Sequence, residues 1–271
     1  MQFLPEISFE TFQWVILPVP FEATTSYLKG TARGPEAIIE SSAQLEDFDT
    51  MAGREAIRDH GFYTDDTWEF SGSLIEVGKR VEFWLEKGKK ILALGGEHSI
   101  TIPIVPAYKK YYPDLAVVHF DAHADLRDAY EGSSLSHACA MRRVLDHVPI
   151  YSLGLRAYSQ EEKDLILERS IPVLHAWEMD DTSRVIEFLD QVPPNVYISF
   201  DVDAVDPSEI PTTGTPQPGG ISFRQSITAL GHLFEHRNIV GADVVETRPI
   251  AGLEYGVFTV ASLCHFMLGR G

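Results

Sequence analysis

The sequence of 271 residues has few cysteines, few basic side chains and no long hydrophobic run. Its two cysteines, Cys139 and Cys264, match no metal-binding spacing, which favours a reducing, cytoplasmic compartment over an extracellular one. No run of eighteen apolar residues occurs, so we expect no membrane-spanning helix. The segment from Met1 to Glu10 lacks the basic region that opens a signal peptide. These absences argue against a membrane protein and against a disulfide-stabilised secreted domain.

Basic residues are outnumbered, because 22 Lys and Arg stand against 40 Asp and Glu, giving a net charge of −18. Binding to nucleic acid needs basic patches, so this balance argues against a nucleic-acid partner. An acidic surface could attract a small cationic molecule, or it could only keep the protein in solution. The composition leaves both interpretations open.

Apolar residues make up 44% of the sequence and fall into short runs that alternate with helical patterns. Such alternation predicts βαβ units and a mainly parallel sheet with helices on both faces. The chain has no linker-like stretch, so we expect one α/β domain over residues 1–271. The segment from Pro207 to Gly220 is rich in proline and glycine and predicts an active-site loop.

The predicted elements can be given as residue ranges. The strands are Trp14–Val19, Ile91–Leu94, Ala116–Phe120, Ile150–Leu153, Val173–His175, Val196–Phe200 and Ile239–Val245. The helices are Glu36–Leu45, Leu74–Leu85, Arg184–Leu189, Ser222–Phe234 and Val257–Leu268.

A polar cluster follows the predicted strand Ala116–Phe120 and reads Asp121-Ala122-His123-Ala124-Asp125. Alternate residues of an extended chain point to the same side, so Asp121, His123 and Asp125 converge near the carboxyl end of the strand. That end is where open α/β sheets place their ligands. Two carboxylates and an imidazole at one point would repel and desolvate one another, and a divalent cation removes this cost.

Two further strand ends carry the same kinds of side chain, in Gly95-Gly96-Glu97-His98-Ser99 and in Ser199-Phe200-Asp201-Val202-Asp203. The candidate metal ligands are His98, Asp121, His123, Asp125, Asp201 and Asp203. The four aspartates carry a charge of −4, which two divalent cations balance and one cation does not. Oxygen and imidazole ligands without thiolate favour manganese, since magnesium usually takes fewer protein ligands. Two such ions about 3.5–4 Å apart could hold a bridging hydroxide.

Each of these motifs has a plainer interpretation when taken alone. A single Asp-x-His or Asp-x-Asp is more often a turn cap or a hydrogen-bonded polar residue than a metal site. The presence of three motifs at three strand ends favours the metal site. His119 shares the parity of the ligands but lies deeper in its strand, so we expect a core or supporting role for it.

The motif set resembles that of the ureohydrolases, the superfamily of arginases, agmatinases and formimidoylglutamases. The matching segments are residues 30–35, 95–99, 121–125 and 199–203, Asp206-Pro207, Gly214-Thr215-Pro216 and Glu246. The resemblance implies a three-layer α/β/α fold and a site for two Mn²⁺ ions. It implies that one ion takes His98, Asp121, Asp125 and Asp201. It implies that the other takes Asp121, His123, Asp201 and Asp203.

The resemblance also implies two catalytic residues, His137 and Glu246. His137 matches a family histidine that shuttles protons near the leaving amine, a task that suits an imidazole. Glu246 matches a glutamate that holds the guanidinium, and a carboxylate can accept paired hydrogen bonds from that planar group. The bridging hydroxide would attack the guanidinium carbon, giving urea and an amine. Without the resemblance, Ser136-His137-Ala138 could equally be an ordinary helix start.

The substrate is the least determined feature. The residues from Asp125 to His137 are most similar to those of agmatinases, which implies cleavage of agmatine to putrescine and urea. Asp128 and Glu131 suit the cationic tail of agmatine, or they face solvent. Arg127 could instead bind a carboxylate, which keeps arginine, guanidinobutyrate and formimidoylglutamate open.

Two other classes of protein remain to be compared with this hypothesis. A metal-binding paralogue without catalysis would be expected to lack counterparts of His137 or Glu246, and both are present. A two-metal phosphoesterase would need Arg or Lys around the metals, of which the acidic motifs supply little. The family commonly forms trimers or hexamers, so the resemblance implies a homo-oligomer.

Overall fold

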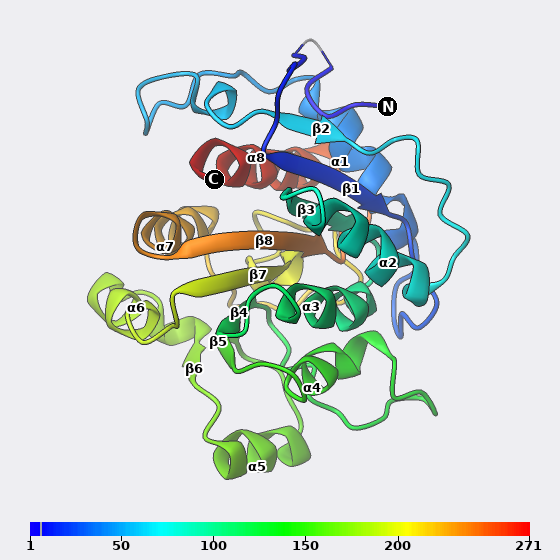
Figure 1. Ribbon diagram of the computed structural model, residues 1–271. Coiled ribbons are helices and arrows are strands. Elements are labelled where there is room, and N and C mark those ends of the chain that lie inside the picture. The colour runs from blue at the N-terminus through cyan, green and yellow to red at the C-terminus, as the bar shows by residue number, and fades with distance from the viewer. Residues whose placement is uncertain (6) are drawn as a thin grey trace.

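A computed structural model describes residues 1–5 and 7–271 of the chain. Its centre is an eight-stranded sheet, with helices packed on both faces (Figure 1). The strands are β1 (Trp14–Val19), β2 (Phe62–Thr64), β3 (Lys90–Gly95), β4 (Leu115–Phe120), β5 (Ile150–Leu155), β6 (Val173–His175), β7 (Asn195–Asp201) and β8 (Asn238–Val245). The α-helices are α1 (Gly34–Ser42), α2 (Leu74–Leu85), α3 (Thr101–Lys109), α4 (Ala140–Val144), α5 (Gln160–Arg169), α6 (Thr182–Leu189), α7 (Phe223–His236) and α8 (Glu254–Arg270). Short 3₁₀ helices are η1 (Thr31–Arg33), η2 (Ala56–Arg58), η3 (His98–Ile100), η4 (His137–Cys139), η5 (Ala176–Glu178) and η6 (Val202–Ala204).

The strands pair in the order β2-β1-β3-β8-β7-β4-β5-β6, and every pair is parallel. Along the chain, β4 follows β3, but β8 and β7 lie between them in the sheet. The carboxyl ends of β3, β8, β7 and β4 therefore lie side by side at one edge of the sheet. In open α/β sheets, ligands bind at this edge, beside the point where the strand order reverses.

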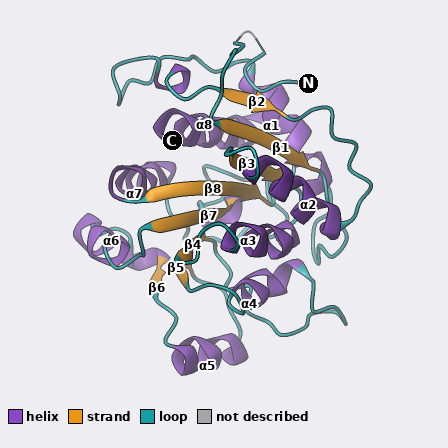
Figure 2. Ribbon diagram, in the orientation of Figure 1, coloured by secondary structure: helices purple, strands orange, loops and turns teal. Residues whose placement is uncertain are grey.

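The helices form two layers, one on each face of the sheet (Figure 2). One layer consists of α1, α6, α7 and α8, whose side chains share a core with Leu94 and Val118. The other layer consists of α2, α3, α4 and α5, which pack with Ala93 and Val117. Because both faces are covered, every residue of β4 is buried, as expected for a parallel strand. The three-layer α/β/α fold expected from the sequence is confirmed.

The predicted strands are present, with ends that differ by no more than two residues from those expected. The pattern missed β2, which has only three residues, and the helices α3, α4 and α5. Pro103 and Pro106 lie within α3 and hide its helical character. Most of α5 is polar, so it carries almost no apolar stripe from which to recognise a helix.

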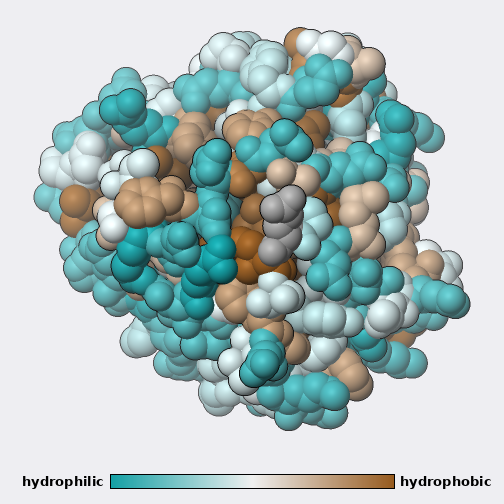
Figure 3. All heavy atoms as spheres, turned by 90° about the horizontal axis from the view of Figure 1, so that it is seen from above, coloured by the Kyte–Doolittle hydropathy of each residue, from teal (hydrophilic) through white to brown (hydrophobic). Residues whose placement is uncertain are grey.

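Figure 3 shows one face of the molecule, on which hydrophilic side chains predominate and hydrophobic residues form smaller patches. This appearance agrees with the excess of acidic residues in the sequence. Among the helices of the described residues, none combines the length and the apolar character needed to cross a bilayer.

Candidate metal centre and active site

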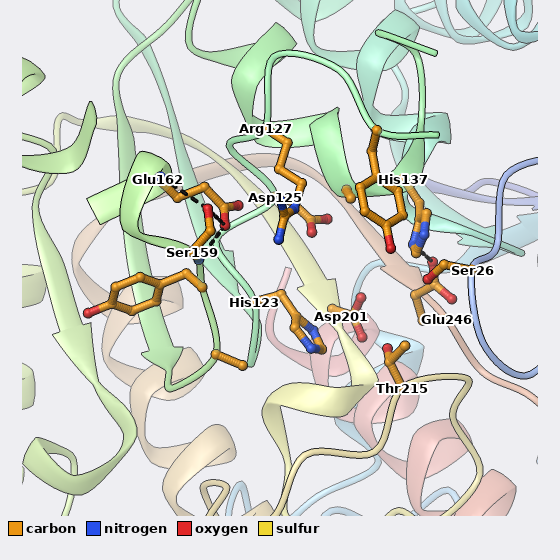
Figure 4. A pocket seen from close by; sticks show the side chains of 14 residues that line it. Ser26, His123, Asp125, Arg127, His137, Ser159, Glu162, Asp201, Thr215 and Glu246 are labelled. Atoms are coloured by element: carbon orange, nitrogen blue, oxygen red, sulfur yellow. Dashed lines mark hydrogen bonds and ion pairs between the residues drawn. The ribbon is translucent and has the colours of Figure 1, made fainter. Parts of the chain in front are cut away.

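A cavity of about 390 Å³ opens at the carboxyl edge of the central strands (Figure 4). The residues that line it include Ser26, His123, Asp125, Arg127, Tyr130, His137, Tyr158, Ser159, Glu162, Asp201, Thr215 and Glu246. Its size lies in the range of small-molecule sites, and its lining is rich in carboxylates and imidazoles. Five of the predicted site residues line the cavity, namely His123, Asp125, His137, Asp201 and Glu246.

His98 begins η3, directly after β3, and its imidazole is fully buried. The Nδ1 atom lies 3.2 Å from Asp121 Oδ2 and 3.1 Å from Asp125 Oδ2. It also lies 3.4 Å from Asp201 Oδ2. Among the described residues, this nitrogen has no hydrogen-bond partner of acceptable geometry. The strand ends of β3, β4 and β7 thus converge around one imidazole nitrogen.

The other nitrogen of His98 fixes the state of the ring. Asp243 is a buried carboxylate on β8, and a carboxylate can only accept, so the Ser199 hydroxyl donates to its Oδ1 at 2.8 Å. The Ser199 oxygen then accepts from Nε2–H of His98, at 2.9 Å. Thr101 and Tyr197 donate to the other oxygen of Asp243, both at 2.9 Å. A neutral His98 must therefore point the lone pair of Nδ1 at three carboxylates.

A lone pair and three carboxylates cannot share a buried space unless positive charge lies among them. Burial lowers the pKa of His98, but the close carboxylates of Asp121, Asp125 and Asp201 raise it well above its ordinary value. Burial, together with the charges of Asp203 and Asp121, also raises the pKa of Asp201. The arrangement attracts a proton or a cation, and its oxygen and imidazole donors fit a divalent metal ion.

A second group of candidate ligands lies beside the first. Nδ1 of His123 lies 3.0 Å from Asp203 Oδ2 and 3.5 Å from Asp121 Oδ1. Ligand atoms of these three residues all lie within 4.8 Å of one another. Asp121 thus faces both groups, since its other oxygen points at His98. Asp203 is oriented by hydrogen bonds from the amide of Ala122 (3.0 Å) and the hydroxyl of Thr215 (3.1 Å).

His119 lies behind Asp121, with Nε2 at 2.8 Å from Asp121 Oδ2 and Nδ1 at 3.2 Å from Ser152 Oγ. Ligand atoms of His119, His98 and Asp121 also lie within 4.8 Å of one another. Burial raises the pKa of Asp121, but the hydrogen bond and charge of His119 and the contacts of His123 and His98 lower it well below the usual range. His119 is fully buried and does not line the cavity, so its position suits the supporting role expected for it.

Two residues of the site adopt a left-handed backbone conformation that non-glycine residues rarely take. Asp125 has φ of 51° and Glu246 has φ of 64°. Such conformations cost energy and concentrate at functional sites. Here they turn each carboxylate into the cavity, Glu246 directly after β8 and Asp125 in the loop that follows β4 (Figure 4).

His137 and Glu246 face each other across one end of the cavity (Figure 4). Nδ1 of His137 lies 3.6 Å from Glu246 Oε1, and Nε2 is buried without a partner among the described residues. Burial lowers the pKa of His137, but the hydrogen bond to Glu246 and its charge raise it to about 9. Burial raises the pKa of Glu246, opposed by His137. His137 is also the first residue of η4, with Ser136 as its N-cap residue, so the segment is a helix start as well as part of the cavity wall.

The structure brings all of the predicted site residues to one edge of the sheet. The sequence did not single out several residues that orient them. Asp243 could have been noticed, because it is a charged residue within the apolar run Ile239–Val245. Arg156 had no such signal. It donates hydrogen bonds to the carbonyl oxygens of Asp203 and Gln217, and so ties the metal-site segment to the loop that precedes α7.

Comparison with known proteins agrees with this geometry. The sequence pattern of the arginase family matches residues 12–268. An N(1)-aminopropylagmatine ureohydrolase of Synechocystis sp. is 38% identical over 94% of this chain and 88% of its own length. An agmatinase of Bacillus anthracis is 36% identical over 90% of this chain and 86% of its own length. The crystal structure of the agmatine ureohydrolase of Thermoplasma volcanium superposes with a TM-score of 0.85 at 30% identity, covering 96% of this chain and 89% of that one. These relatives are hydrolytic enzymes, and this chain belongs to the arginase family.

Proposed function

We propose that the protein hydrolyses the guanidino group of agmatine, releasing putrescine and urea, with two Mn²⁺ ions as cofactors. The arginase family depends on a binuclear metal centre, and this chain carries two adjoining groups of candidate ligand atoms. The observation that carries the proposal is the buried Nδ1 of His98, which faces three carboxylates next to a cavity. When bound, the two cations supply the charge that makes water a nucleophile at neutral pH.

The ligand assignment follows the two groups in space. His98, Asp121, Asp125 and Asp201 would hold one ion. Asp121, His123, Asp201 and Asp203 would hold the other. The hydrogen bonds from Ser199 to Asp243 and from His98 to Ser199 keep Nδ1 of His98 free to bind a metal ion.

Glu246 and His137 act on the substrate rather than on the metal ions. Glu246 Oε1 accepts a hydrogen bond from the backbone amide of His98 at 2.9 Å, which fixes the carboxylate at the cavity wall. A carboxylate in this position can accept paired hydrogen bonds from a planar guanidinium and orient it. With its pKa raised to about 9, His137 holds a proton at neutral pH and can donate it from Nε2 to the leaving amine.

A second substrate is favoured by the residues that line the far side of the cavity and by the names of the relatives. Glu162 and Ser159 line the cavity on the side opposite Glu246 and His137 (Figure 4). A carboxylate at that end suits the additional amino group of N(1)-aminopropylagmatine, the substrate in the name of the Synechocystis relative. Arg127 also lines the cavity and lies over the ring of Tyr130 at 5.2 Å, which keeps carboxylate-bearing substrates among the outcomes of a test.

The decisive experiment measures urea release by the manganese-loaded protein. We expect release from agmatine that stops on chelation. Asp203→Asn and Glu246→Gln should each lower kcat/KM by at least about 100-fold with the fold retained, because each removes an interaction with the reacting groups. Full activity after chelation or in Asp203→Asn contradicts the binuclear site. No urea from any guanidino substrate, with metal bound, would favour a metal-binding paralogue without catalysis.

Substrate choice is tested by comparing kcat/KM for agmatine, N(1)-aminopropylagmatine, guanidinobutyrate, arginine and formimidoylglutamate. Glu162→Gln can keep the hydrogen bonds from Ser159 in the N-terminal capping box of α5, since glutamine can serve in that role. It loses the bond that Leu126 N donates to Oε1 at 3.1 Å, so its Tm is measured beside its activity. It should impair the longer polyamine substrate more than agmatine. Arg127→Ala should leave cationic substrates unharmed, and a loss limited to guanidinobutyrate or arginine would identify a carboxylate-binding role.

We further propose that residues 1–271 form one domain that works in the cytoplasm as a homo-oligomer, a trimer or hexamer. The net charge of −18 suits a small cationic substrate and disfavours nucleic acid as a partner. Light scattering of the purified protein tests the oligomer, and a monomer at micromolar concentration would contradict it.

A further inference from the structure

The segment between β1 and η1, residues 20–30, lies against the site and contributes Ser26 to the cavity wall. It can approach because Gly96 has no side chain. A Cβ atom on Gly96 would lie 2.1 Å from the carbonyl oxygen of Phe21. This close approach allows two backbone hydrogen bonds, from Gly96 N to Val19 O at 3.0 Å and from Glu97 N to Phe21 O at 2.9 Å. The glycine of the motif therefore brings Glu97 into contact with this segment.

Glu97 is fully buried, and four donors surround its carboxylate. Oε2 accepts from the backbone amides of Ala23 (2.7 Å) and Thr24 (2.6 Å). Oε1 accepts from the hydroxyls of Thr24 and Ser99, both at 2.6 Å. A carboxylate has about four acceptor positions, so Glu97 has none left for a metal ion or a substrate. Its charge is used to hold the segment 20–30 in place.

The hydroxyl of Thr24 is oriented in one direction only. It must donate its proton to Glu97, because a carboxylate only accepts. Its lone pair then accepts from the backbone amide of His137, at 2.9 Å. That amide is the first of the helix η4 and has no acceptor within the helix. The hydrogen bonds from His137 to Thr24 and from Thr24 to Glu97 join three segments that are far apart in the sequence.

We propose that Thr24 is a positioning residue for the reaction, and that Glu97 orients it for this task. The Thr24 hydroxyl holds the backbone of His137, whose side chain lines the cavity with Nδ1 directed toward Glu246. The inference rests on the proposed function, in which His137 donates a proton to the leaving amine. Thr24 itself is not among the residues that line the cavity. Its effect therefore passes through His137.

The test compares variants that differ by one hydroxyl. Thr24→Val keeps the shape and removes the hydroxyl, with Thr24→Ala as the alternative if valine does not fit. We expect kcat to fall roughly 10- to 100-fold while KM changes less than about threefold, because small displacements of a catalytic group are costly. Thr24→Ser keeps the hydroxyl and should restore kcat. Thr25→Val is the matched control, since the Thr25 hydroxyl bonds Glu22 in the same segment and not His137.

Two further measurements separate positioning from a general structural role. In a His137→Asn background, Thr24→Val should cause no additional loss of kcat. Hydrogen exchange of the His137 amide should become faster in Thr24→Val and remain slow in Thr24→Ser. An equal loss of kcat in both backgrounds, or unchanged exchange in Thr24→Val, overturns the inference. If the wild-type protein releases no urea from any substrate, the proposed function fails, and the exchange measurement still decides whether Thr24 holds His137.

Discussion

Asp201→Asn should change the stability of the protein in opposite directions with and without metal ions. Asp201 is buried at the end of β7, and its Oδ2 lies 3.4 Å from Nδ1 of His98. Oxygens of Asp121 and Asp125 lie 3.2 and 3.1 Å from the same nitrogen. Because all three oxygens contact the same nitrogen, the oxygens of Asp121 and Asp125 each lie at most about 6.6 Å from Asp201 Oδ2, the sum of the two longest distances. The substitution keeps the oxygen that accepts from the amide of Asp203.

The balance of charges gives the expected direction of the change for the metal-free protein. At an effective dielectric of about 20, repulsion from Asp121 and Asp125 costs at least about 2.5 kcal/mol each. Attraction between Asp201 and a protonated His98 stabilises the site by about 5 kcal/mol, so this attraction and the two repulsions roughly cancel. Burial and the charge of Asp203 remain, and they raise the pKa of Asp201. Metal-free Asp201→Asn should therefore be more stable than wild type at neutral pH and melt at a higher temperature.

The pH dependence has a defined sign. Because the folded pKa of Asp201 is raised, the wild-type protein loses stability as the pH rises above the ordinary aspartate range. The advantage of the variant is therefore full at high pH and vanishes below about pH 4, where the carboxyl is protonated in both states.

Metal ions should reverse the order of the two proteins. A ligand at 100 times its Kd stabilises the folded state by about 2.7 kcal/mol. Manganese should thus raise the Tm of the wild type by roughly 5 °C. It should raise the Tm of Asp201→Asn less, because a ligand is missing.

The assay is calorimetry at pH 8 after chelation and dialysis, with and without added MnCl₂. Asp164→Asn, an exposed aspartate on α5, is the control for a change of net charge. A metal-free variant no more stable than wild type, or equal metal-induced shifts in both proteins, refutes the reasoning.

Two further substitutions test the surroundings of the site. Gly96→Ala would place a Cβ atom 2.1 Å from Phe21 O. We therefore expect the free energy of unfolding, measured with urea, to fall by about 3 kcal/mol. A urea midpoint equal to that of the wild type would contradict the close approach. The carboxylate of Asp206 accepts hydrogen bonds from the backbone amides of Ser208, Gly219 and Gly220. The hydroxyl of Ser208 and these amides lower the pKa of Asp206 to about 2. Its stabilisation is present above the ordinary aspartate pKa and is lost as the pH falls toward 2, so Asp206→Asn should lower Tm at pH 7 by an amount equivalent to about 1 kcal/mol. The difference in Tm between Asp206→Asn and wild type should narrow between pH 5 and pH 3. A constant difference would argue against stabilisation by the ionised carboxylate of Asp206.

The sequence by itself determined the fold class and the chemistry of the strand ends. Continuous apolar runs such as Val196–Phe200 can be buried on both faces only in a covered parallel sheet. The two-residue period of a strand predicted that Asp121, His123 and Asp125 converge, which they do, although β4 ends at Phe120 and the left-handed backbone of Asp125 turns its carboxylate into the cavity. These features are local, because backbone geometry and burial fix them within a few residues. The short β2 escaped prediction because pairing with β1, rather than its own pattern, stabilises it. The polar helix α5 lacks an apolar stripe, and its one local signal is the capping box of Ser159 and Glu162.

Only the tertiary structure decided which groups support the site. The strand order places β8 and β7 between β3 and β4, and this brings Asp243 behind His98 and Glu246 beside His137. Hydrogen bonds connect Thr24 to Glu97, 73 positions away in the sequence, and to His137, 113 positions away. No periodicity encodes such contacts, because they depend on how separate segments pack. The sequence determined which residues could bind metal ions, and the packing of the sheet decided what holds them in position.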